Sequence, residues 1–368
     1  MDSIYIGTMS GTSMDGLDLV AAHFTETILT EILVSQFIPY PQDLKARLQS
    51  LALDNKASVN QMCELDHELG QFYADAINQF IDLNRLDREQ VSAIGLHGQT
   101  IRHSIQGRYP YTLQIGDANI VAARTERPVV ADFRRKDVAF HGQGAPLAPA
   151  FHNQVFRSRT VNRAIINIGG IANITFLPAD LDKDIFGFDS GPGNTLMDHV
   201  CQLKFDRAYD QDGCIASQGV NHPERIQNIL NNEAYFQMAY PKSTGTDYFS
   251  PDWLQSTGLL ELEPEDCITC LAELTSASIA LAALSLEQAV DEYYICGGGA
   301  HNAYLLQSLK KHLNNDQVYT TEKLGIHPDW VEACAFAWLA CQTIHKKPGN
   351  LPSVTNAEKF TILGAVYF

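Results

Sequence analysis

Short apolar runs bounded by glycine, proline and hydroxylated residues alternate along this chain with longer stretches in which apolar residues recur at helical spacing. The short runs predict strands at 4–6, 17–22, 31–37, 92–96, 128–131, 164–168, 171–177, 184–188, 291–295 and 361–368. The periodic stretches predict helices at 43–53, 58–83, 113–123, 195–203, 224–232, 251–256, 264–286, 303–313 and 328–343. Because the two kinds of element alternate, we expect an α/β protein.

The first two predicted strands enclose a turn, residues 7–16, made of glycines and hydroxylated side chains. Glycines let backbone N–H groups approach an anion closely, and hydroxyls add donors. Asp15 and Asp18 would repel a phosphate unless a cation such as Mg²⁺ lies between their carboxylates and the phosphate. The stretch therefore indicates a metal–phosphate site, with an ordinary tight hairpin as the alternative. It is not a Walker A loop, because no G-x-x-x-x-G-K-[ST] occurs in the chain.

Two further loops of small residues, 189–194 and 297–302, also follow short predicted strands. The first precedes a predicted helix, an arrangement that binds phosphate at the helix N-terminus. The second contains three consecutive glycines, which permit close approach of a flat ligand or a phosphate. Each loop alone is more often an ordinary turn. Together the three loops favour a nucleotide site, because a polyphosphate needs donors from several loops.

The second half of the chain opens with the same layout as the first. A strand, a Gly-Gly turn and a second strand at 164–177 repeat the strand–turn–strand layout of 4–22. This weak echo indicates a duplication with a cleft between the halves. The Gly/Pro-rich stretch 141–149 interrupts the pattern, and we predict a domain boundary just before it.

Composition and charge narrow the class of protein. A chain of 368 residues is long enough for two domains. A net charge of −17 argues against nucleic acid or an acidic membrane surface as partner. The N-terminus lacks the pattern of a secretory signal, and no run approaches the roughly 18 apolar residues of a spanning helix. Cys267-x-x-Cys270 has no second pair to complete a zinc site, so core packing is expected there and the chain is expected to be cytosolic.

Several polar residues at predicted strand ends are candidates for chemistry. Asp189 is the best candidate for a base that takes a proton from a nucleophile, and its alternative role is to cap the following helix. Glu332 is either a substrate ligand or a surface residue in the first turn of a helix. His97 is either a structural histidine or a contact to a sugar hydroxyl. The basic run Arg134-Arg135-Lys136 either binds an anionic group or is solvated.

Nine segments, in order and over nearly the whole chain, resemble the anhydro-N-acetylmuramic acid kinase family. They are GTMSGTSMDGLD, GLHGQTIRH, ADFRRKDVA with HGQGAPLAP, NIGGIANIT, GFDSGPGN, STGTDYFS, ICGGGAHN and VEACAFAWLA. The resemblance implies two ribonuclease-H-like domains with a nucleotide cleft between them, as in sugar kinases, acetate kinase, actin and the heat-shock ATPase chaperones. We assign 1–137 with 344–368 to the first domain and 138–343 to the second.

The family reaction implied by the resemblance couples hydrolysis to phosphorylation. Water attacks the anomeric carbon of 1,6-anhydro-N-acetylmuramic acid while the freed 6-oxygen takes the γ-phosphate of ATP, giving N-acetylmuramic acid 6-phosphate and ADP. In this family Asp189 is expected to activate the water. The residues expected to hold the sugar are His97, Glu332 and either Arg134 or Arg135. A basic residue among them is expected to bind the lactyl carboxylate of the sugar. The implied pathway is cell-wall sugar recycling in the bacterial cytoplasm.

The resemblance also implies residues for the nucleotide and its cation. The residues expected to bind ATP are Gly11, Thr12, Ser13, Met14, Asp15, Gly16, Leu17, Asp18, Gly191, Gly193, Asn194, Gly297, Gly298 and Gly299. Mg²⁺ is expected to bridge the phosphates, with Asp15 and Asp18 contacting it through water. A homodimer is expected from the resemblance alone. His141 stands where the family pattern has glycine, which makes contacts of that loop harder to assign.

Two other function classes remain open from the sequence. A different sugar or acetate kinase would share the phosphate loops but not HGQT together with HGQGAPLAP. A nucleotide-driven binding protein related to actin or the chaperones would hydrolyse ATP slowly without sugar and would bind polypeptide. The substrate dependence of ATP turnover separates the three.

Overall fold

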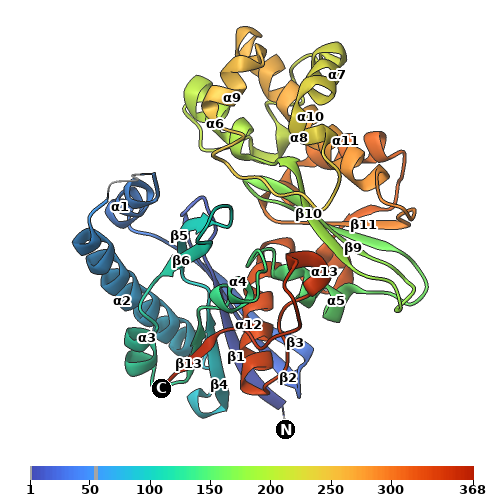
Figure 1. Ribbon diagram of the computed structural model, residues 1–368. Coiled ribbons are helices and arrows are strands. Elements are labelled where there is room, and N and C mark those ends of the chain that lie inside the picture. Colours follow the sequence, from blue (N-terminus) through green and yellow to red (C-terminus); the bar gives the residue numbers. More distant parts are fainter. Residues whose placement is uncertain (1, 54–56) are drawn as a thin grey trace. The chain divides into compact units, whose positions relative to one another are not determined.

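The computed structural model describes residues 2–53 and 57–368, which form two compact units (Figure 1). The first unit comprises the chain up to Val155 together with Trp330–Phe368, and the second comprises Phe156–Asp329. Each unit is a mixed α/β structure built on one central sheet. The expected α/β class is confirmed.

The sheet of the first unit has six strands in the order β13-β7-β4-β1-β2-β3. Its strands are β1 (Asp2–Met9), β2 (Gly16–Thr25), β3 (Ile28–Pro39), β4 (Val91–Leu96), β7 (Val129–Ala131) and β13 (Ala365–Tyr367). Strand β1 pairs antiparallel with β2 and parallel with β4, and β4 pairs parallel with β7. A separate hairpin, β5 (Gln99–Ser104) with β6 (Tyr111–Ile115), follows β4.

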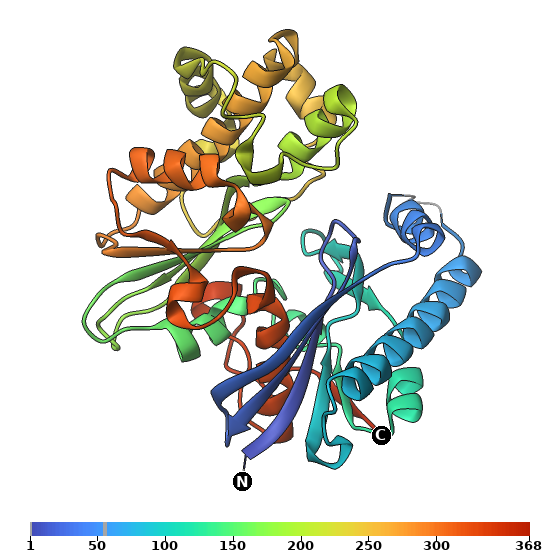
Figure 2. The ribbon, with the colours of Figure 1, turned by 180° about the vertical axis from the view of Figure 1, so that it is seen from behind.

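Helices cover both faces of this sheet (Figures 1 and 2). The helices of the unit are α1 (Gln42–Leu53), α2 (Val59–Leu83), α3 (Ala118–Thr125), α4 (Arg135–Ala139), α5 (Ala148–Phe156), α12 (Val331–Ile344) and α13 (Pro352–Thr355), with 3₁₀ turns at Arg88–Gln90 and Pro328–Trp330. Ile4 and Ile6 of β1 share a core with α2, whereas Gly7 faces α12. Because successive side chains of a strand point to opposite faces, α2 and α12 lie on opposite sides of the sheet.

Glycine in the middle of two strands allows α12 to lie directly on the sheet. A Cβ at Gly7 would lie 1.9 Å from the carbonyl oxygen of Ala333, and one at Gly95 would lie 2.1 Å from that of Phe336. No side chain fits at these distances. Gly7, expected to belong to the polar turn, is therefore a packing residue of β1.

Gly7→Ala is expected to lower the free energy of unfolding by at least about 2 kcal/mol, because its methyl group would meet backbone atoms of α12 that cannot rotate away. Gly11→Ala is the matched control, since nothing lies within 4 Å of a Cβ at Gly11. Urea denaturation followed by circular dichroism measures both. Equal midpoints for the two variants would contradict this account of the helix–sheet contact.

The sheet of the second unit has five strands in the order β10-β9-β8-β11-β12. They are β8 (Arg163–Ile168), β9 (Ile171–Leu177), β10 (Phe186–Pro192), β11 (Glu292–Cys296) and β12 (Val318–Thr320). The first three pair antiparallel, and β8, β11 and β12 run parallel. The first unit has the same order and the same directions in β3-β2-β1-β4-β7. This repeated arrangement is the ribonuclease-H-like one, so the expected fold class is confirmed, and the repeated strand order agrees with the expected similarity of the two halves.

One long helix forms the centre of the second unit. Helix α10 (Pro264–Leu284) packs against β9, β10 and three of the other helices of the unit, the first, second and last in chain order. The other helices are α6 (Thr195–Phe205), α7 (Pro223–Asn232), α8 (Ala234–Gln237), α9 (Pro251–Ser256) and α11 (Ala303–Leu313), with 3₁₀ turns at Gln211–Gly213, Leu259–Glu261, Gly298–His301 and Thr321–Leu324. Cys267 and Cys270 are free thiols buried in its core, as expected.

By length and composition alone, α10 is apolar enough to cross a membrane, and it is the one such helix in the described part of the chain. The expectation that no run approaches that length was wrong on this criterion. Of its most apolar window, 89% is buried inside the structure.

The units begin and end at other residues than the predicted domains. The boundaries lie at Val155/Phe156 and Asp329/Trp330, whereas the sequence suggested 137/138 and 343/344. The physical reason is the packing of α12, which lies on β1, β2 and β4 and so folds with the first sheet. Helix α5 joins the same unit, with Phe151 against Trp338 at 6.1 Å between ring centroids.

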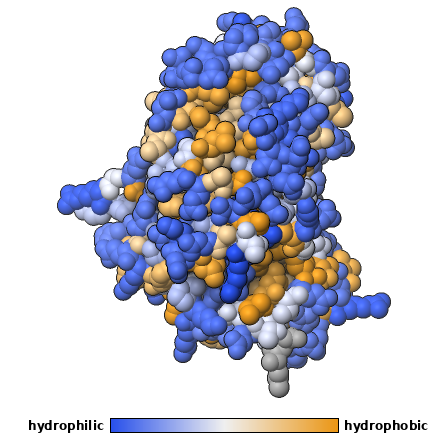
Figure 3. Space-filling view, turned by 90° about the vertical axis from the view of Figure 1, so that its right-hand side faces the viewer, coloured by the Kyte–Doolittle hydropathy of each residue, from blue (hydrophilic) through white to orange (hydrophobic). Residues whose placement is uncertain are grey.

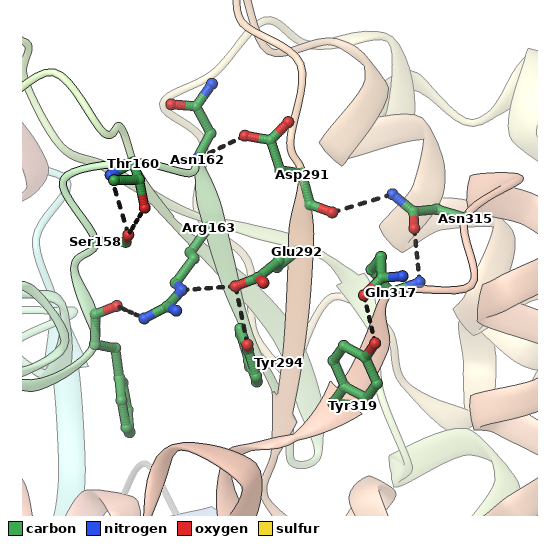
Figure 4. A network of polar contacts seen from close by, with 11 residues as sticks. Ser158, Thr160, Asn162, Arg163, Asp291, Glu292, Tyr294, Asn315, Gln317 and Tyr319 are labelled. Atoms are coloured by element: carbon green, nitrogen blue, oxygen red, sulfur yellow. Dashed lines mark hydrogen bonds and ion pairs between the residues drawn. The ribbon is translucent and has the colours of Figure 1, made fainter.

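A polar network at the amino ends of β8 and β11 fixes the register of the second sheet (Figure 4). Arg163 Nε lies 2.9 Å from Glu292 Oε2, which also accepts a hydrogen bond from the hydroxyl of Tyr294. The backbone N–H of Asn162 donates to Asp291 Oδ2 at 2.7 Å. Because β8 and β11 are parallel, this network lies at the opposite end of the strands from the loops that follow them, and we read it as structural.

Hydrophilic side chains cover most of the side drawn in Figure 3, and hydrophobic residues interrupt it in separate places. Among the apolar residues exposed in the structure are Ile28 and Phe37 of the edge strand β3.

Candidate active site

His97, Arg134 and Glu332 form a polar cluster at the carboxyl edge of the first sheet. His97 follows β4 directly, and only 4% of it is exposed. Arg134 donates to His97 Nε2 from Nε at 3.2 Å and from Nη2 at 2.9 Å. The ring of His97 also packs on Phe336, at 4.6 Å between centroids, one turn along α12 from Glu332. The first unit thus brings a cation, a carboxyl group and an imidazole to one place.

Burial governs the charge states in this cluster. Burial and the adjacent Arg134 charge hold the pKa of His97 well below its usual value, against a smaller opposite effect of the Ser10 and Gly98 backbone. His97 is therefore neutral and accepts at Nε2 from Arg134. Burial raises the pKa of Glu332, and the Arg134 charge partly offsets that. Burial lowers the pKa of Arg134, against the charges of Glu332 and Asp137. A further anion near Arg134 would relieve its cost of burial.

A buried aspartate holds the Gly/Pro-rich loop against this cluster. Asp137 is fully buried and accepts from Gly144 N at 2.8 Å, Asn350 Nδ2 at 2.9 Å and Thr355 Oγ1 at 2.8 Å. The carbonyl of Gly144 in turn accepts from Arg134 Nη1 at 3.0 Å. The loop therefore presents a backbone acceptor that helps fix the guanidinium.

The neighbouring basic residues point elsewhere. Arg135 is exposed and pairs with Asp132, with Nε 2.7 Å from Oδ1. His141 is also exposed, has a φ of 62°, and lies 3.6 Å from Glu358. The residue that replaces the expected glycine thus retains a backbone conformation typical of glycine. Of the two arginines left open by the sequence, Arg134 is the one in the cluster.

The turn between β1 and β2, residues 10–15, is the first of the three predicted phosphate loops. Thr12, Ser13 and Asp15 are exposed, and Asp15 forms an ion pair with Lys45. Met14 and Leu17 are buried in the core of the first unit, so only their backbone can reach a ligand.

Strands β2 and β3 hold the end of this turn. Gly16 lies in β2, where a Cβ would meet the carbonyl of Ile38 at 2.3 Å. Asp18 is half-buried in the same strand and pairs with Phe37 in the register of the sheet. The exposed part of the turn at 10–15 is therefore held by a rigid pair of strands.

A break in strand β10 positions Asp189 in the second unit. The register between β10 and β9 shifts between Asp189 and Gly191, which marks a bulge that turns the side chain out of the regular pleat. Gly191 has a φ of 152°, and a Cβ there would lie 2.8 Å from Phe236. The hydroxyl of Tyr235 donates to the Asp189 carbonyl at 2.7 Å.

Residues 243 and 244, which follow a loop at 239–242, hold the carboxylate of Asp189. Thr244 N donates to Asp189 Oδ2 at 3.0 Å, and Ser243 Oγ donates to the same oxygen at 3.1 Å. Burial raises the pKa of Asp189 to about 6, although these two hydrogen bonds lower it. Both bonds go to Oδ2, so Oδ1 is the oxygen that can accept a proton. A carboxylate with these properties fits a general base near neutral pH.

The other two predicted phosphate loops meet at the carboxyl end of the second sheet. A Cβ at Gly193 would lie 2.2 Å from the carbonyl oxygen of Gly169, and one at Gly297 would lie 2.3 Å from Asn167 Oδ1. A Cβ at Gly299 would lie 2.4 Å from Ile168 Cγ2. Asn194 donates from Nδ2 to the Ile168 carbonyl at 3.2 Å and begins helix α6. Three backbone segments thus converge closely beside a helix N-terminus, which suits a phosphate or a ribose.

A family model described as anhydro-N-acetylmuramic acid kinase matches residues 3–368. The chain belongs to the anhydro-N-acetylmuramic acid kinase family. A protein of that name from Coxiella burnetii (strain RSA 493 / Nine Mile phase I) is 46% identical over 365 residues, covering 99% of this chain and 97% of the relative. One from Shewanella pealeana is 44% identical over 368 residues, covering 100% and 99%. One from Pasteurella multocida is 43% identical over 370 residues, covering 99% and 96%. The resemblance inferred from the motifs is confirmed.

Solved structures are similar only at a distance. The activator of 2-hydroxyisocaproyl-CoA dehydratase from Clostridium difficile with bound ADPNP is 12% identical, with a TM-score of 0.45, over 93% of this chain and 95% of that one. A ROK family glucokinase from Streptomyces griseus in complex with glucose and AMPPNP is 12% identical, with a TM-score of 0.37, over 90% and 97%. Scores this low carry no argument about activity.

As a member of a carbohydrate kinase family, the chain is a phosphotransferase. Of the residues predicted to hold the sugar, three lie together in one cluster: His97, Arg134 and Glu332. Arg135 does not belong to that cluster. The residues predicted around Asp189 and Gly297 lie at one end of the second sheet. Their roles stay predictions.

Sequence reasoning missed several residues that shape these sites. Asp137, Gln99 and Thr244 were named only as parts of polar motifs, although each makes a hydrogen bond to a predicted site loop or residue. The available signal was hydroxyl and amide side chains inside the motifs HGQT and STGTD. Hairpin β5–β6 was missed: Gln99 opens a strand although HGQT reads as a turn, and residues 113–115, expected to open a helix, lie in β6.

Proposed function

We propose that this kinase opens the 1,6-anhydro ring of 1,6-anhydro-N-acetylmuramic acid with water and phosphorylates the 6-oxygen, giving N-acetylmuramic acid 6-phosphate and ADP. Membership of the family supports the substrate. The observation that supports the base of this reaction is Asp189, a buried carboxyl with a pKa of about 6 and Oδ2 fixed by two hydrogen bonds. A kinase that merely phosphorylates a hydroxyl and one that activates water both need a base, and the assay below distinguishes them.

In the proposed reaction, Asp189 Oδ1 takes a proton from a water molecule while the oxygen of that water bonds to the anomeric carbon. The bond from that carbon to the 6-oxygen breaks, and its electron pair stays on the 6-oxygen. That oxygen bonds to the γ-phosphorus of ATP, and ADP leaves. Because the leaving oxygen is trapped as a phosphate ester, ring opening is drawn forward without a separate acid.

The first-unit cluster is proposed to hold the sugar. Arg134 is fixed by His97 and by the carbonyl of Gly144, so its guanidinium is oriented before the ligand binds. A planar cation suits the lactyl carboxylate of the sugar. Glu332 is proposed to accept from sugar hydroxyls. Orientation of this kind lowers the entropy cost of bringing water, sugar and ATP together.

ATP is proposed to bind through the turn 10–15 and the loops at 191–194 and 297–299. Mg²⁺ would supply charge neutralisation of the phosphates when bound. No group of three His, Cys, Asp or Glu side chains in the described ranges could hold a metal by itself. Asp18 would hold the cation through water, whereas Asp15 would first have to leave Lys45. A homodimer and a cytoplasmic location stay predictions from the resemblance.

ADP release from ATP and Mg²⁺ tests this function, measured with the anhydro sugar, with N-acetylmuramic acid, and with no sugar. We expect turnover only with the anhydro sugar. In water enriched in heavy oxygen, the 6-phosphate product is expected to carry the label at its anomeric position when it is analysed within minutes. Equal turnover with N-acetylmuramic acid would favour a plain sugar kinase, and sugar-independent ADP release would favour an ATPase of the binding-protein class.

A further inference from the structure

A chain of buried hydrogen bonds runs from helix α2 to the tip of the first phosphate loop. The hydroxyls of Tyr73 and Tyr40 lie 2.7 Å apart, and Tyr40 donates to Ser10 Oγ at 2.9 Å. Ser10 Oγ donates to Gln99 Oε1 at 2.7 Å, and Gln99 Nε2 donates to the carbonyl of Gly11 at 3.2 Å. No member of the four side chains is more than 6% exposed. Every link lies inside the first unit.

The chemistry of these groups gives the chain one direction. A hydroxyl carries a single proton, so Tyr40 and Ser10 each donate onward and accept from the preceding group. The amide of Gln99 is then fixed with Oε1 toward Ser10 and Nε2 toward Gly11. A glutamate in its place could accept from Ser10 but could not donate to Gly11.

Gln99 therefore controls which way one peptide group of the loop faces. The carbonyl of Gly11 also accepts from Met14 N at 3.2 Å, so it is held toward the protein by two donors. In a planar trans peptide the carbonyl and the following N–H point in opposite directions. The N–H of Thr12 thus faces away from Gln99, on the side of an exposed residue where a phosphate can reach it.

The same residue is joined rigidly to the sugar cluster. Gln99 lies two residues after His97, which Arg134 holds with two hydrogen bonds. Between them, Gly98 has a φ of 76°, and a Cβ there would lie 2.7 Å from the Ile115 carbonyl. The backbone of Ile115 leaves little room beside Gly98, so a shift of His97 is expected to shift Gln99 as well.

We propose that Gln99 is a positioning residue that couples occupancy of the sugar site to the orientation of the phosphate loop at 10–15. The proposal rests on the proposed function, in which His97 contacts the sugar and the loop contacts ATP. A sugar that fixes His97 also fixes Gln99, and with it the N–H of Thr12. ATP is then bound more tightly when the sugar is present, which limits ATP hydrolysis without sugar.

Titration calorimetry tests the coupling, with a non-hydrolysable ATP analogue and the anhydro sugar measured alone and in each other's presence. In the wild type we expect each ligand to tighten the other by the same factor. In Gln99→Ala and Gln99→Glu we expect analogue binding in saturating sugar to weaken about tenfold, the effect of one lost hydrogen bond, while sugar binding alone changes less than about twofold. Gln99→Glu keeps the acceptor for Ser10, so its loss reports the donor at Nε2, which reaches the carbonyl of Gly11 at 3.2 Å and that of Thr100 at 3.4 Å.

Gln114→Ala is the matched control, because Gln114 bonds only to Thr100 and Thr112 among the hydrogen bonds of its hairpin. It is expected to keep the wild-type coupling. If the alanine variant does not fold, Tyr40→Phe removes the donor to Ser10 without a cavity and is expected to reduce the coupling in the same direction. Lower melting temperatures with unchanged coupling in the Gln99 variants would overturn the proposal and leave a structural role.

Failure of the proposed function is seen separately in this design. A wild type that binds the analogue but not the anhydro sugar would refute the substrate, and the coupling with it. A wild type that binds both ligands without either tightening the other would refute the coupling and leave the proposed substrate standing.

Discussion

Asp189→Asn is expected to lower kcat by about 10³-fold, within the range that general base catalysis contributes, while the KM for ATP changes less than about twofold. Asparagine has the same shape, and its carbonyl oxygen can still accept from Thr244 N and Ser243 Oγ. It cannot take a proton from water. Steady-state ADP release at saturating anhydro sugar measures the loss, and analogue binding shows that the site remains folded.

The same residue predicts the pH dependence of the wild type. A base must be ionised, and burial raises the pKa of Asp189 to about 6. The rate is therefore expected to be full well above pH 6 and to fall with a slope of one proton as the pH drops through about 6. Ser243→Ala removes one of the two bonds that favour the ionised form, so the acid limb of its profile is expected to move to higher pH.

Asp184→Asn is the matched control for charge, since Asp184 is exposed just before β10. It is expected to keep the wild-type rate and profile. A normal kcat in Asp189→Asn, or a profile that stays flat below about pH 6, would remove Asp189 as the base and leave its carboxylate a structural role.

The elements of this fold were predictable where the pattern is local. Apolar periodicity placed α2 and α10, and glycine-rich turns placed the three loops, because both signals depend on neighbours in sequence. The hairpin echo between 4–22 and 164–177 correctly indicated two sheets of one design. Short elements such as β12 and α4 escaped, since three to five residues carry too little pattern.

Contacts between distant segments could not be read from the chain. Gly7 was assigned to a polar turn, but its role is set by Ala333, far along the sequence, and nothing near Gly7 encodes that contact. Asp189 was placed in a loop, but it belongs to β10 through a bulge whose register depends on β9. Arg134 and Arg135 are adjacent, and only burial against His97 separates them.

The difference between the buried Arg134 and its exposed neighbour Arg135 leads to the second large effect that we expect. Arg134→Met is expected to raise the KM for the anhydro sugar by about 100-fold or more, because it removes the oriented cation proposed to bind the lactyl carboxylate. It also leaves Glu332 buried without the positive charge that lowers its pKa. The carboxyl group is then expected to be protonated to higher pH, which weakens its interaction with sugar hydroxyls further.

The KM for ATP is the internal reference for this variant, and it is expected to change much less than the KM for the sugar. Arg134→Lys retains charge but cannot make the forked contact to His97 together with the bond to Gly144, so an intermediate KM for the sugar is expected.

Arg135→Met is the matched control, because Arg135 is exposed and pairs only with Asp132 among the ion pairs of this segment. It is expected to leave both KM values within about twofold, since exposed ion pairs contribute little. A larger effect at Arg135 than at Arg134 would contradict the assignment, because it would place the binding cation on the solvated side of α4 rather than in the buried cluster.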